Sequence, residues 1–293
     1  MFDGFKRFRQ ATSGAEIAGV TGGAGPPLLL LHGYPQTHAM WHKVAPALAQ
    51  RFTVVAADLR GYGASSKPPS DADHAPYSKR AMAQDMIEVM AALGHERFGV
   101  CGHDRGGRVA HRMALDHAAA VRRLAVLDIA PTREMYRGTT EAFARAYWHW
   151  FWLTLPAPEP ERMIGADPEA FLTYKMGHAS AGLAPFTPAA WAAYLDAFGD
   201  PETVHAMCED YRAAASIDIA HDEADGGRKV AAPLLAIWGR DGVIERCFDC
   251  MALWKERAMD VRGMAIGGGH YLAEECPDAL LPHLVAFFSE PSQ

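Results

Sequence analysis

The sequence predicts an α/β fold built on a mostly parallel β-sheet. Short, continuous apolar runs recur along most of the 293 residues, and such runs are typical of strands covered on both faces. Helical stretches separate them, and this alternation indicates parallel strands joined by helical crossovers. Residues 132–221 lack these runs and are rich in Trp, Tyr and Phe, which favours a block of helices inserted into the sheet domain.

Eight strands are expected, with the helical insertion after the sixth. The first two form a hairpin that opens the chain, and the remaining six read as buried strands. Their expected ranges are 5–9, 16–20, 27–31, 52–57, 98–101, 124–127, 234–238 and 264–266. Helices are expected over residues 41–49, 81–93 and 105–117.

The insertion divides the chain into a core domain, residues 1–131 and 222–293, and a helical cap, residues 132–221. Parallel sheets of this class bind ligands at the carboxyl ends of their strands. A cap over that edge would enclose a pocket for a small molecule.

Composition narrows the class of partner. The net charge of −7 disfavours nucleic acid and anionic membrane surfaces. No apolar run approaches membrane-spanning length, and residues 1–10 do not resemble a signal peptide, so we expect a cytoplasmic protein. The 5 cysteines argue against a disulfide framework. Cys247 and Cys250 form an isolated C-x-x-C that reads as helix neighbours, and no metal site is expected.

A sharp turn that carries an acid at its tip is expected at residues 102–108, GHDRGGR. An acid between glycines, after a strand and before a helix, fits the nucleophile-elbow pattern, with Asp104 in the place of the nucleophile. Aspartate that attacks a saturated carbon forms an ester, which water can hydrolyse to regenerate it. With an ordinary pKa of about 3.9, Asp104 needs no base to ionise it. The alternative interpretation is an N-cap for the next helix.

Ester hydrolysis needs a base, and His270 is the candidate. It follows three glycines after the last expected strand, and histidine titrates near neutral pH. A carboxylate must orient the imidazole. The chain offers two, Asp128 and Asp241, which end consecutive strands, and the residue pattern leaves both open.

Two arginines predict an anionic substrate. Arg105 and Arg108 share a helix face about one turn apart, and guanidinium groups match carboxylates in a bidentate manner. A carboxylate held there would present its α-carbon to Asp104. The alternative is a pair of surface arginines, and Arg112, one turn further along, is expected to be a surface residue.

These features together resemble the α/β-hydrolase fold, and within it the fluoroacetate dehalogenase family of haloacetate dehalogenases. The likeness extends over nearly the whole chain. The closer match rests on GHDRGGR (102–108), LDIAPT (127–132), YWHW (147–150) and CEDYR (208–212). The resemblance assigns the orienting acid to Asp128, implies no cofactor, and suggests a homodimer.

The resemblance also implies roles for the cap and for one loop. In it, His149, Trp150 and Tyr211 donate hydrogen bonds to the halide. The backbone N–H groups of Tyr34 and Arg105 form an oxyanion hole. Trp41 is a further candidate for lining the pocket. Three other aromatic residues of the cap, Trp148, Phe151 and Trp152, are expected to pack in its interior.

The function expected from this resemblance is hydrolysis of haloacetates, with fluoroacetate as a candidate substrate, to glycolate and halide. The alternative within the fold is an epoxide hydrolase, which uses the same Asp–His–acid triad and two cap tyrosines. Besides Tyr211, four tyrosines are candidates for the second: Tyr136, Tyr147, Tyr174 and Tyr194. An alternative from another class is a receptor of the same fold that binds its ligand without turnover.

Overall fold

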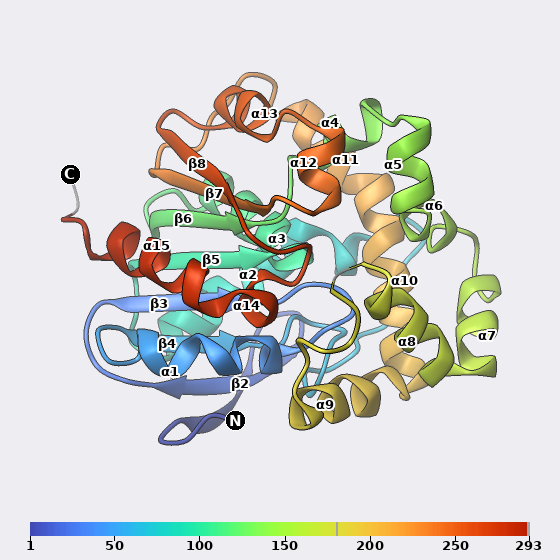
Figure 1. Ribbon diagram of the computed structural model, residues 1–293, viewed down its shortest axis with the longest axis horizontal. Coiled ribbons are helices and arrows are strands. Elements are labelled where there is room, and N and C mark those ends of the chain that lie inside the picture. Colours follow the sequence, from blue (N-terminus) through green and yellow to red (C-terminus); the bar gives the residue numbers. More distant parts are fainter. Residues whose placement is uncertain (180, 292–293) are drawn as a thin grey trace.

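An eight-stranded sheet forms the centre of the structure, a computed structural model that describes residues 1–179 and 181–291 (Figure 1). The strand order is β1-β2-β4-β3-β5-β6-β7-β8. β2 pairs antiparallel with β1 and with β4, and every other neighbouring pair is parallel. The predicted mostly parallel sheet is therefore confirmed.

The strands lie close to their expected positions. They are β1 (Lys6–Ala11), β2 (Glu16–Gly22), β3 (Pro27–Leu31), β4 (Thr53–Ala57), β5 (Phe98–His103), β6 (Val121–Leu127), β7 (Leu234–Gly239) and β8 (Val261–Ile266). Among the strands that follow the cap, β8 differs most from its expected range. It begins at residue 261, three residues before the expected start at 264. It is an edge strand in which exposed and partly buried residues alternate, so it lacks the continuous apolar run of a central strand.

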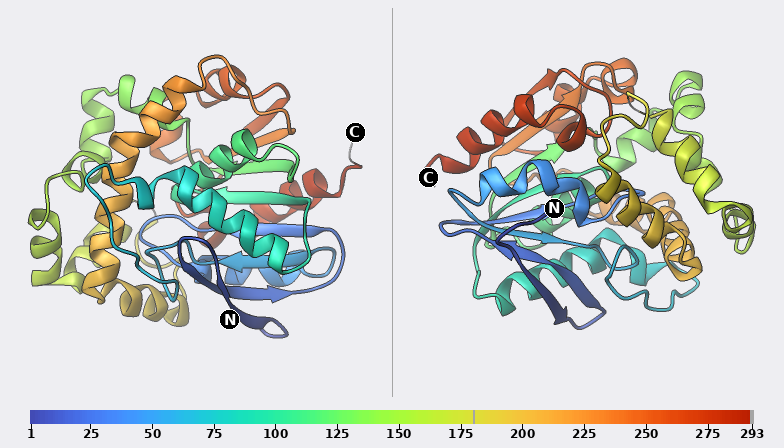
Figure 2. Two further views of the ribbon diagram at one scale, coloured as in Figure 1. Left: turned by 180° about the vertical axis from the view of Figure 1, so that it is seen from behind. Right: turned by 60° about the horizontal axis from the view of Figure 1, so that its bottom comes forward.

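Helices cover both faces of the sheet. The short 3-10 helix η1 (His38–Lys43) leads into α1 (Ala45–Leu48), which lies with α15 (Pro277–Ser289) on one face (Figure 1). α2 (Lys79–Ala92) and α3 (Arg105–Asp116) lie on the other face (Figure 2). α13 (Cys250–Arg257) packs against α3, where the rings of Trp254 and His111 are 5.2 Å apart. Three short helices complete the core: η2 (Ala75–Tyr77), α12 (Val243–Cys247) and α14 (Leu272–Glu275).

The chain between β6 and β7 forms a layer of helices beyond the carboxyl ends of the strands (Figure 1). These helices are α4 (Thr132–Arg137), α5 (Glu141–Ala146), α6 (His149–Trp152), α7 (Glu159–Ala166), α8 (Pro168–Gly177), α9 (Pro188–Phe198), α10 (Pro201–Ala215) and α11 (Ile217–Ala224). The last of them continues past residue 221. Across the described ranges, no helix combines the length and the apolar character needed to cross a membrane.

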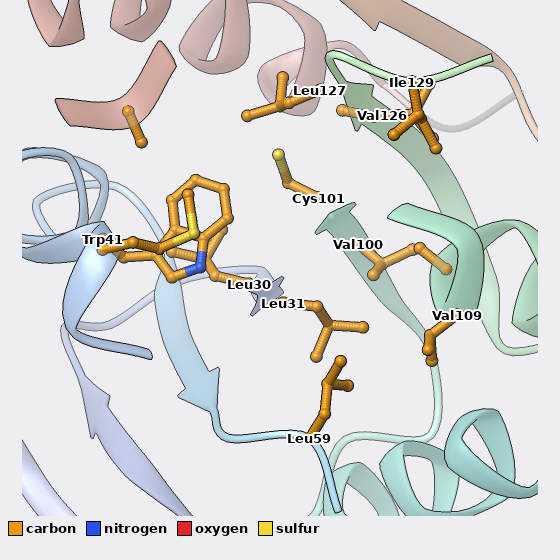
Figure 3. Close-up of a cluster of buried hydrophobic side chains, with 14 of the residues drawn as sticks. Leu30, Leu31, Trp41, Leu59, Val100, Cys101, Val109, Val126, Leu127 and Ile129 are labelled. Atoms are coloured by element: carbon orange, nitrogen blue, oxygen red, sulfur yellow. The ribbon is translucent and has the colours of Figure 1, made fainter. Parts of the chain in front are cut away.

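The core lies between the central strands and the helices that cover them (Figure 3). β3, β5 and β6 are buried on both faces, which explains why their sequences read as unbroken apolar runs. Their labelled side chains are Leu30, Leu31, Val100, Cys101, Val126 and Leu127. Burying one such leucine or valine side chain contributes about 1.5–3 kcal/mol, so this cluster fixes the strand ends on which the site is built.

Arg112 is buried, and our expectation of a surface residue was wrong. Its guanidinium bonds Asp222 and Asp225 at 2.6 Å each, and Asp116 of its own helix at 3.3 Å. Asp222 belongs to α11, so the cluster ties the helical insertion to α3. Asp222 and Asp225 lie more than one hundred residues further along the chain, where helical spacing gives no sign of them.

Candidate active site

Asp104 lies at the tip of a strained turn between β5 and α3. Its backbone angles are φ 43° and ψ −114°, a conformation that costs a non-glycine residue free energy and marks functional sites. A Cβ on Gly102 would lie 2.3 Å from the carbonyl oxygen of Gly106, and a Cβ on Gly106 would lie 2.4 Å from that of His32. Both flanking positions therefore require glycine, as the elbow pattern predicts.

The Asp104 carboxylate is buried and surrounded by positive charge. The backbone N–H of Tyr34 donates to its Oδ2 at 3.1 Å, and Arg108 Nε lies 4.0 Å from its Oδ1. Burial disfavours the charged form, but the charges of His270, Arg108 and Arg105 outweigh it and lower the pKa of Asp104. The carboxylate is therefore ionised at neutral pH, with Oδ1 turned away from the Tyr34 N–H.

His270 contacts Asp128 and not Asp241. His270 Nδ1 donates to Asp128 Oδ2 at 2.6 Å, and the second oxygen, Oδ1, accepts the backbone N–H of Gly239 at 3.0 Å. Asp241 is an exposed residue in the turn after β7. Of the two acids that the sequence left open, the structure brings only Asp128 to the histidine.

Two further side chains hold His270 in place. His103 Nε2 donates to the His270 carbonyl oxygen at 2.8 Å. The Tyr147 hydroxyl lies 3.3 Å from His270 Nδ1, the nitrogen that also bonds Asp128. Because Asp128 and Tyr147 both contact Nδ1, Nε2 is the imidazole nitrogen that can accept a proton. Neither His103 nor Tyr147 was expected in this role from the sequence, because no local pattern links either residue to His270.

Arg105 is held by an acid of the cap helix α10. Its Nε and Nη2 donate to the Asp210 carboxylate at 2.9 and 2.6 Å, and Nη2 also donates to the Asp210 carbonyl at 2.7 Å. Burial opposes the charge of Arg105, but Asp210 more than compensates and raises its pKa. The remaining nitrogen, Nη1, is buried and has no partner in the described part of the chain.

Arg108 is held by the loop and helix that follow β6. Its Nη1 donates to the Ala130 carbonyl at 3.1 Å and to Thr132 Oγ1 at 2.9 Å, and Nη2 lies 3.3 Å from the Met135 sulfur. Its Nε is buried and makes no hydrogen bond within residues 1–179 and 181–291, although it lies 4.0 Å from Asp104 Oδ1. Each arginine thus has one nitrogen whose N–H donors make no hydrogen bond in that part of the chain, and neither arginine lies on the surface.

The predicted halide donors lie together above the elbow. His149 and Trp150 begin α6, Tyr211 lies in α10, and all three side chains are buried. The Tyr211 ring centre is 5.8 Å from that of His149 and 6.4 Å from that of Trp150. Among the residues described, His149 Nδ1, Trp150 Nε1 and the Tyr211 hydroxyl have no hydrogen-bond partner. Burial lowers the pKa of His149 well below its usual value, so this donor cluster is uncharged.

The arginines pack on the rings of this donor cluster. The Arg105 guanidinium carbon lies 4.2 Å from the Tyr211 ring centre, and that of Arg108 lies 4.6 Å from the Trp150 ring centre. Cation–π contacts of this kind are attractive, and they fix both cations against the donors. The two arginines and the three uncharged donors therefore pack against one another next to Asp104.

The backbone donors expected for an oxyanion hole lie at the same turn. The Tyr34 N–H already contacts Asp104, as described above. Arg105 is the first residue of α3, where a backbone N–H has no acceptor within the helix. Trp41 is fully buried, and its Nε1 has no partner in the described ranges.

Some cap aromatics do not pack as expected. Phe151 is 36% exposed, and Trp148 and Trp152 are only partly buried. Phe151 lies at the surface, whereas Trp152 and Trp148 pack on Phe171 of α8, with ring centres 5.6 and 6.1 Å apart. His149 and Trp150 are buried. The four-residue length of α6 leaves too little periodicity to separate the two faces in the sequence.

An open pocket of about 540 Å³ adjoins the buried space. It lies between the cap and the loops after β7 and β8, and its lining includes Tyr147, His149, Lys175 and Gly269. Two of these residues, Tyr147 and His149, also belong to the buried site. Lys175 was not singled out from the sequence, because one lysine in a cap helix carries no pattern.

Comparisons with known proteins find relatives over nearly the whole chain. A family model described as the α/β hydrolase fold matches residues 26–245. A fluoroacetate dehalogenase from Burkholderia sp is 47% identical over 99% of this chain and 96% of its own. A crystal structure of an α/β hydrolase from Nostoc sp PCC 7120 is 52% identical and superposes with a TM-score of 0.98, covering 99% of this chain and 100% of that one. A soluble epoxide hydrolase from Corynebacterium sp. (strain C12) is 33% identical over 92% of both chains.

The elbow, the sheet order and these matches define one class of protein. The chain belongs to the α/β-hydrolase family, in its haloacetate dehalogenase branch. The resemblance inferred from the sequence is therefore confirmed at the level of fold and family.

Proposed function

We propose that the protein hydrolyses the carbon–halogen bond of haloacetates, with fluoroacetate as a candidate substrate and glycolate and halide as products. The observation that carries this proposal is the pair of unused donors beside the nucleophile, Arg105 Nη1 and Arg108 Nε. Buried donors without partners are rare and costly. Two on cations next to one aspartate call for an anionic ligand.

In the first step the substrate carboxylate accepts hydrogen bonds from these two donors, which presents its α-carbon to Asp104. Oδ1, the oxygen not held by Tyr34, attacks that carbon and forms a C–O bond. The carbon–halogen bond breaks, and its electron pair leaves with the halide. The product is a carboxymethyl ester of Asp104, and Oδ2 becomes the ester carbonyl oxygen.

The departing halide is met by hydrogen-bond donors. His149, Trp150 and Tyr211 supply N–H and O–H groups in a site from which water is excluded, where preorganised donors stabilise developing charge most strongly. His149 is a donor in its neutral form, and its lowered pKa favours that form.

In the second step His270 Nε2 takes a proton from water, and the resulting hydroxide adds to the Asp104 carboxyl carbon. The oxyanion on Oδ2 is stabilised by the N–H groups of Tyr34 and Arg105. Asp128 holds the Nδ1–H tautomer and offsets the imidazolium charge. Collapse of the intermediate breaks the bond between the Asp104 carboxyl carbon and Oδ1, which leaves in glycolate and takes up the proton held by His270. The second proton of the water is released from the new Asp104 carboxyl group to solvent, which regenerates the carboxylate.

The test is to trap the ester. We expect His270→Asn to form the adduct with chloroacetate or fluoroacetate and to hydrolyse it very slowly, so that intact-protein mass spectrometry shows a carboxymethyl group on Asp104. One equivalent of halide should appear per chain. The double variant Asp104→Asn/His270→Asn is the control and should remain unmodified. A folded His270→Asn protein that stays unmodified with both haloacetates would refute the mechanism.

Epoxide hydrolysis is the second candidate, favoured by the soluble epoxide hydrolase relative and by the unpartnered Tyr211 hydroxyl. Of the other cap tyrosines, Tyr174 is 53% exposed and Tyr194 donates to Glu274. The Tyr136 hydroxyl lies 3.5 Å from the Trp150 carbonyl. Of these four tyrosines, Tyr147 is therefore the one whose hydroxyl lies beside His270. A neutral epoxide would leave Arg105 Nη1 and Arg108 Nε without a ligand, which favours the haloacetate.

A direct comparison separates the two candidates. Halide release from haloacetates and diol formation from an aryl epoxide are measured with the same preparation. We expect halide release to dominate. Diol formation without halide release would favour epoxide hydrolysis, and tight haloacetate binding without either product would favour a receptor.

A further inference from the structure

Lys175 is a buried cation that the mechanism above does not use. It lies in α8, is 6% exposed, and its Nζ is 5.8 Å from the centre of the Tyr34 ring. Within the described ranges, its ammonium has neither a hydrogen-bond acceptor nor a carboxylate partner. Burying a charge without a partner is costly. A visiting anion would supply the missing counter-charge.

The lysine lies on the side of the halide donors. The Tyr34 ring beneath it stacks on His149, with ring centres 5.8 Å apart, and meets the edge of Tyr211 at 5.2 Å. Of the charged groups near His149, Lys175 has the largest effect in lowering its pKa. The two arginines approach Asp104 from α3, whereas Lys175 approaches from the cap.

Lys175 also lines the open pocket of about 540 Å³. Arg145 and Arg246 bring two more cations to its walls, and Asp241 and Glu275 bring two acids. The Glu275 carboxylate already accepts two backbone N–H groups, at 2.6 and 2.7 Å. An anion that moves from the donors to solvent would therefore pass Lys175 and enter a pocket in which positive charge is available.

We propose that Lys175 stabilises the departing halide and receives it on the way to this pocket. The identity of the anion rests on the proposed function. His149, Trp150 and Tyr211 are uncharged, but the halide acquires a full negative charge as the carbon–halogen bond breaks. A cation fixed on that side offsets the charge in a buried site. The lysine forms no covalent bond, and no proton is transferred.

The charge of Lys175 depends on pH. Burial lowers the pKa of Lys175 to about 8, against the opposing effect of Asp104. The ammonium is therefore present below this pH and lost as pH rises through it. Tyr34 and Tyr147 have pKa values raised by burial, and His149 has one lowered by burial, so these neighbours stay neutral over that range. Four other ionisable residues of the pocket lining, Arg145, His178, Asp241 and Arg246, are exposed, and Glu275 is partly buried. Water and salt screen the exposed groups.

The test measures halide binding directly. Sodium chloride and sodium fluoride are titrated into the protein at constant ionic strength, with tryptophan fluorescence as the signal. Lys175→Met and Lys175→Arg are compared with the parent chain at pH 6.5 and 9.5. The exposed Lys229→Met is the matched control for loss of one positive charge, and it should behave as the parent does.

We expect the parent to bind both halides about tenfold or more weakly at pH 9.5 than at pH 6.5, because a group with a pKa near 8 is then mostly uncharged. Lys175→Met should bind halide weakly at both pH values, as the parent does at pH 9.5. Lys175→Arg should bind halide strongly at both pH values, as the parent does at pH 6.5. In the His270→Asn background, Lys175→Met should also slow ester formation about tenfold. A Lys175→Met protein that binds halide as the parent does, at both pH values, would overturn the inference.

Thermal unfolding separates this role from a structural one. Removing a buried charge without an acid partner should leave the melting temperature of Lys175→Met unchanged or raise it, whereas a lysine that supports the fold would lower it. Should Lys175→Met fail to fold, Lys175→Gln takes its place with the same expectations. Halide binding needs no turnover, so it tests Lys175 even if no haloacetate is converted. A missing adduct in His270→Asn alone would count against the proposed function.

Discussion

Arg105 and Asp210 form a fully buried ion pair that joins the core to the cap. Arg105 is the first residue of α3, directly after Asp104, and Asp210 lies in α10. The acid also accepts hydrogen bonds from Lys79 and from the Tyr62 hydroxyl, the latter at 2.6 Å. This pair engages Nε and Nη2 of the guanidinium, so that among the residues described only Nη1, with its two N–H groups, remains for a ligand. Asp210 of the cap thereby determines which nitrogen of Arg105 can donate to a ligand.

Asp210→Asn should lower both the free energy of unfolding and the affinity for the haloacetate substrate. The change leaves Arg105 buried without its acid, while Lys79 keeps Asp218 at 3.2 Å, and breaking a buried pair in this way costs about 3–5 kcal/mol. The same variant should raise KM for haloacetates, because Arg105 is no longer held in position. Urea unfolding and steady-state kinetics measure the two effects. Asp196→Asn, an exposed site in the cap helix α9, should change neither.

Asp128→Asn should slow the second step more than the first. The asparagine cannot hold the His270 tautomer or offset the imidazolium charge, and general-base catalysis contributes about 10²–10⁴-fold. The ester should therefore accumulate during turnover and be visible by mass spectrometry of the quenched enzyme. Asp241→Asn is the matched control. An equal loss of activity in the Asp241 variant would reopen the choice between the two acids.

Tyr211→Phe removes one halide donor with little change in shape. Losing one preorganised donor typically costs about 10²–10³ in rate, so we expect slower ester formation, and a larger loss with fluoroacetate because fluoride carries the more concentrated charge. Stability should be unchanged or slightly higher, since the buried hydroxyl has no partner among the residues described. Rapid-quench halide release measures the rate. The exposed Tyr174→Phe should match the parent with both substrates.

Glu274→Gln should flatten the pH dependence of stability. Glu274 Oε2 accepts from Gln36 Nε2 at 2.5 Å and from the Tyr194 hydroxyl at 2.9 Å, and burial raises its pKa to about 8. Since the folded pKa lies above the unfolded one, its contribution is fully present below the unfolded value of about 4.5 and is lost as pH rises through about 8.

Denaturant unfolding between pH 5 and pH 8 measures this effect. The free energy of unfolding of the parent should fall as pH rises across that window, whereas that of Glu274→Gln should fall less. The reason is that unfolding releases a proton from Glu274, and the variant has no such proton to release. The exposed Glu256→Gln should retain the slope of the parent. Parallel pH profiles for the parent and Glu274→Gln would contradict the assignment.

Much of the fold could be predicted from local sequence because its signals are local. The buried strands β3 to β7 read as unbroken apolar runs. The glycines at positions 102 and 106 indicate a turn in which a Cβ would clash with the backbone. β8 and α6 were less accurately predicted, because an edge strand alternates in exposure and a helix of four residues shows no periodicity. The sequence could also place Asp104 and His270 at the ends of strands.

What the sequence by itself determined is the family to which the chain belongs, and it predicted the reaction type at Asp104, since both depend on short motifs and near neighbours. What only the tertiary structure decided is which groups share one buried space. Asp128 and Asp241 end adjacent strands, and only the folded loops bring one of them to His270. Arg112 and Arg105 meet acids more than one hundred residues away. Lys175 reaches Tyr34 across the domain boundary, a distance in sequence over which residue patterns carry no information.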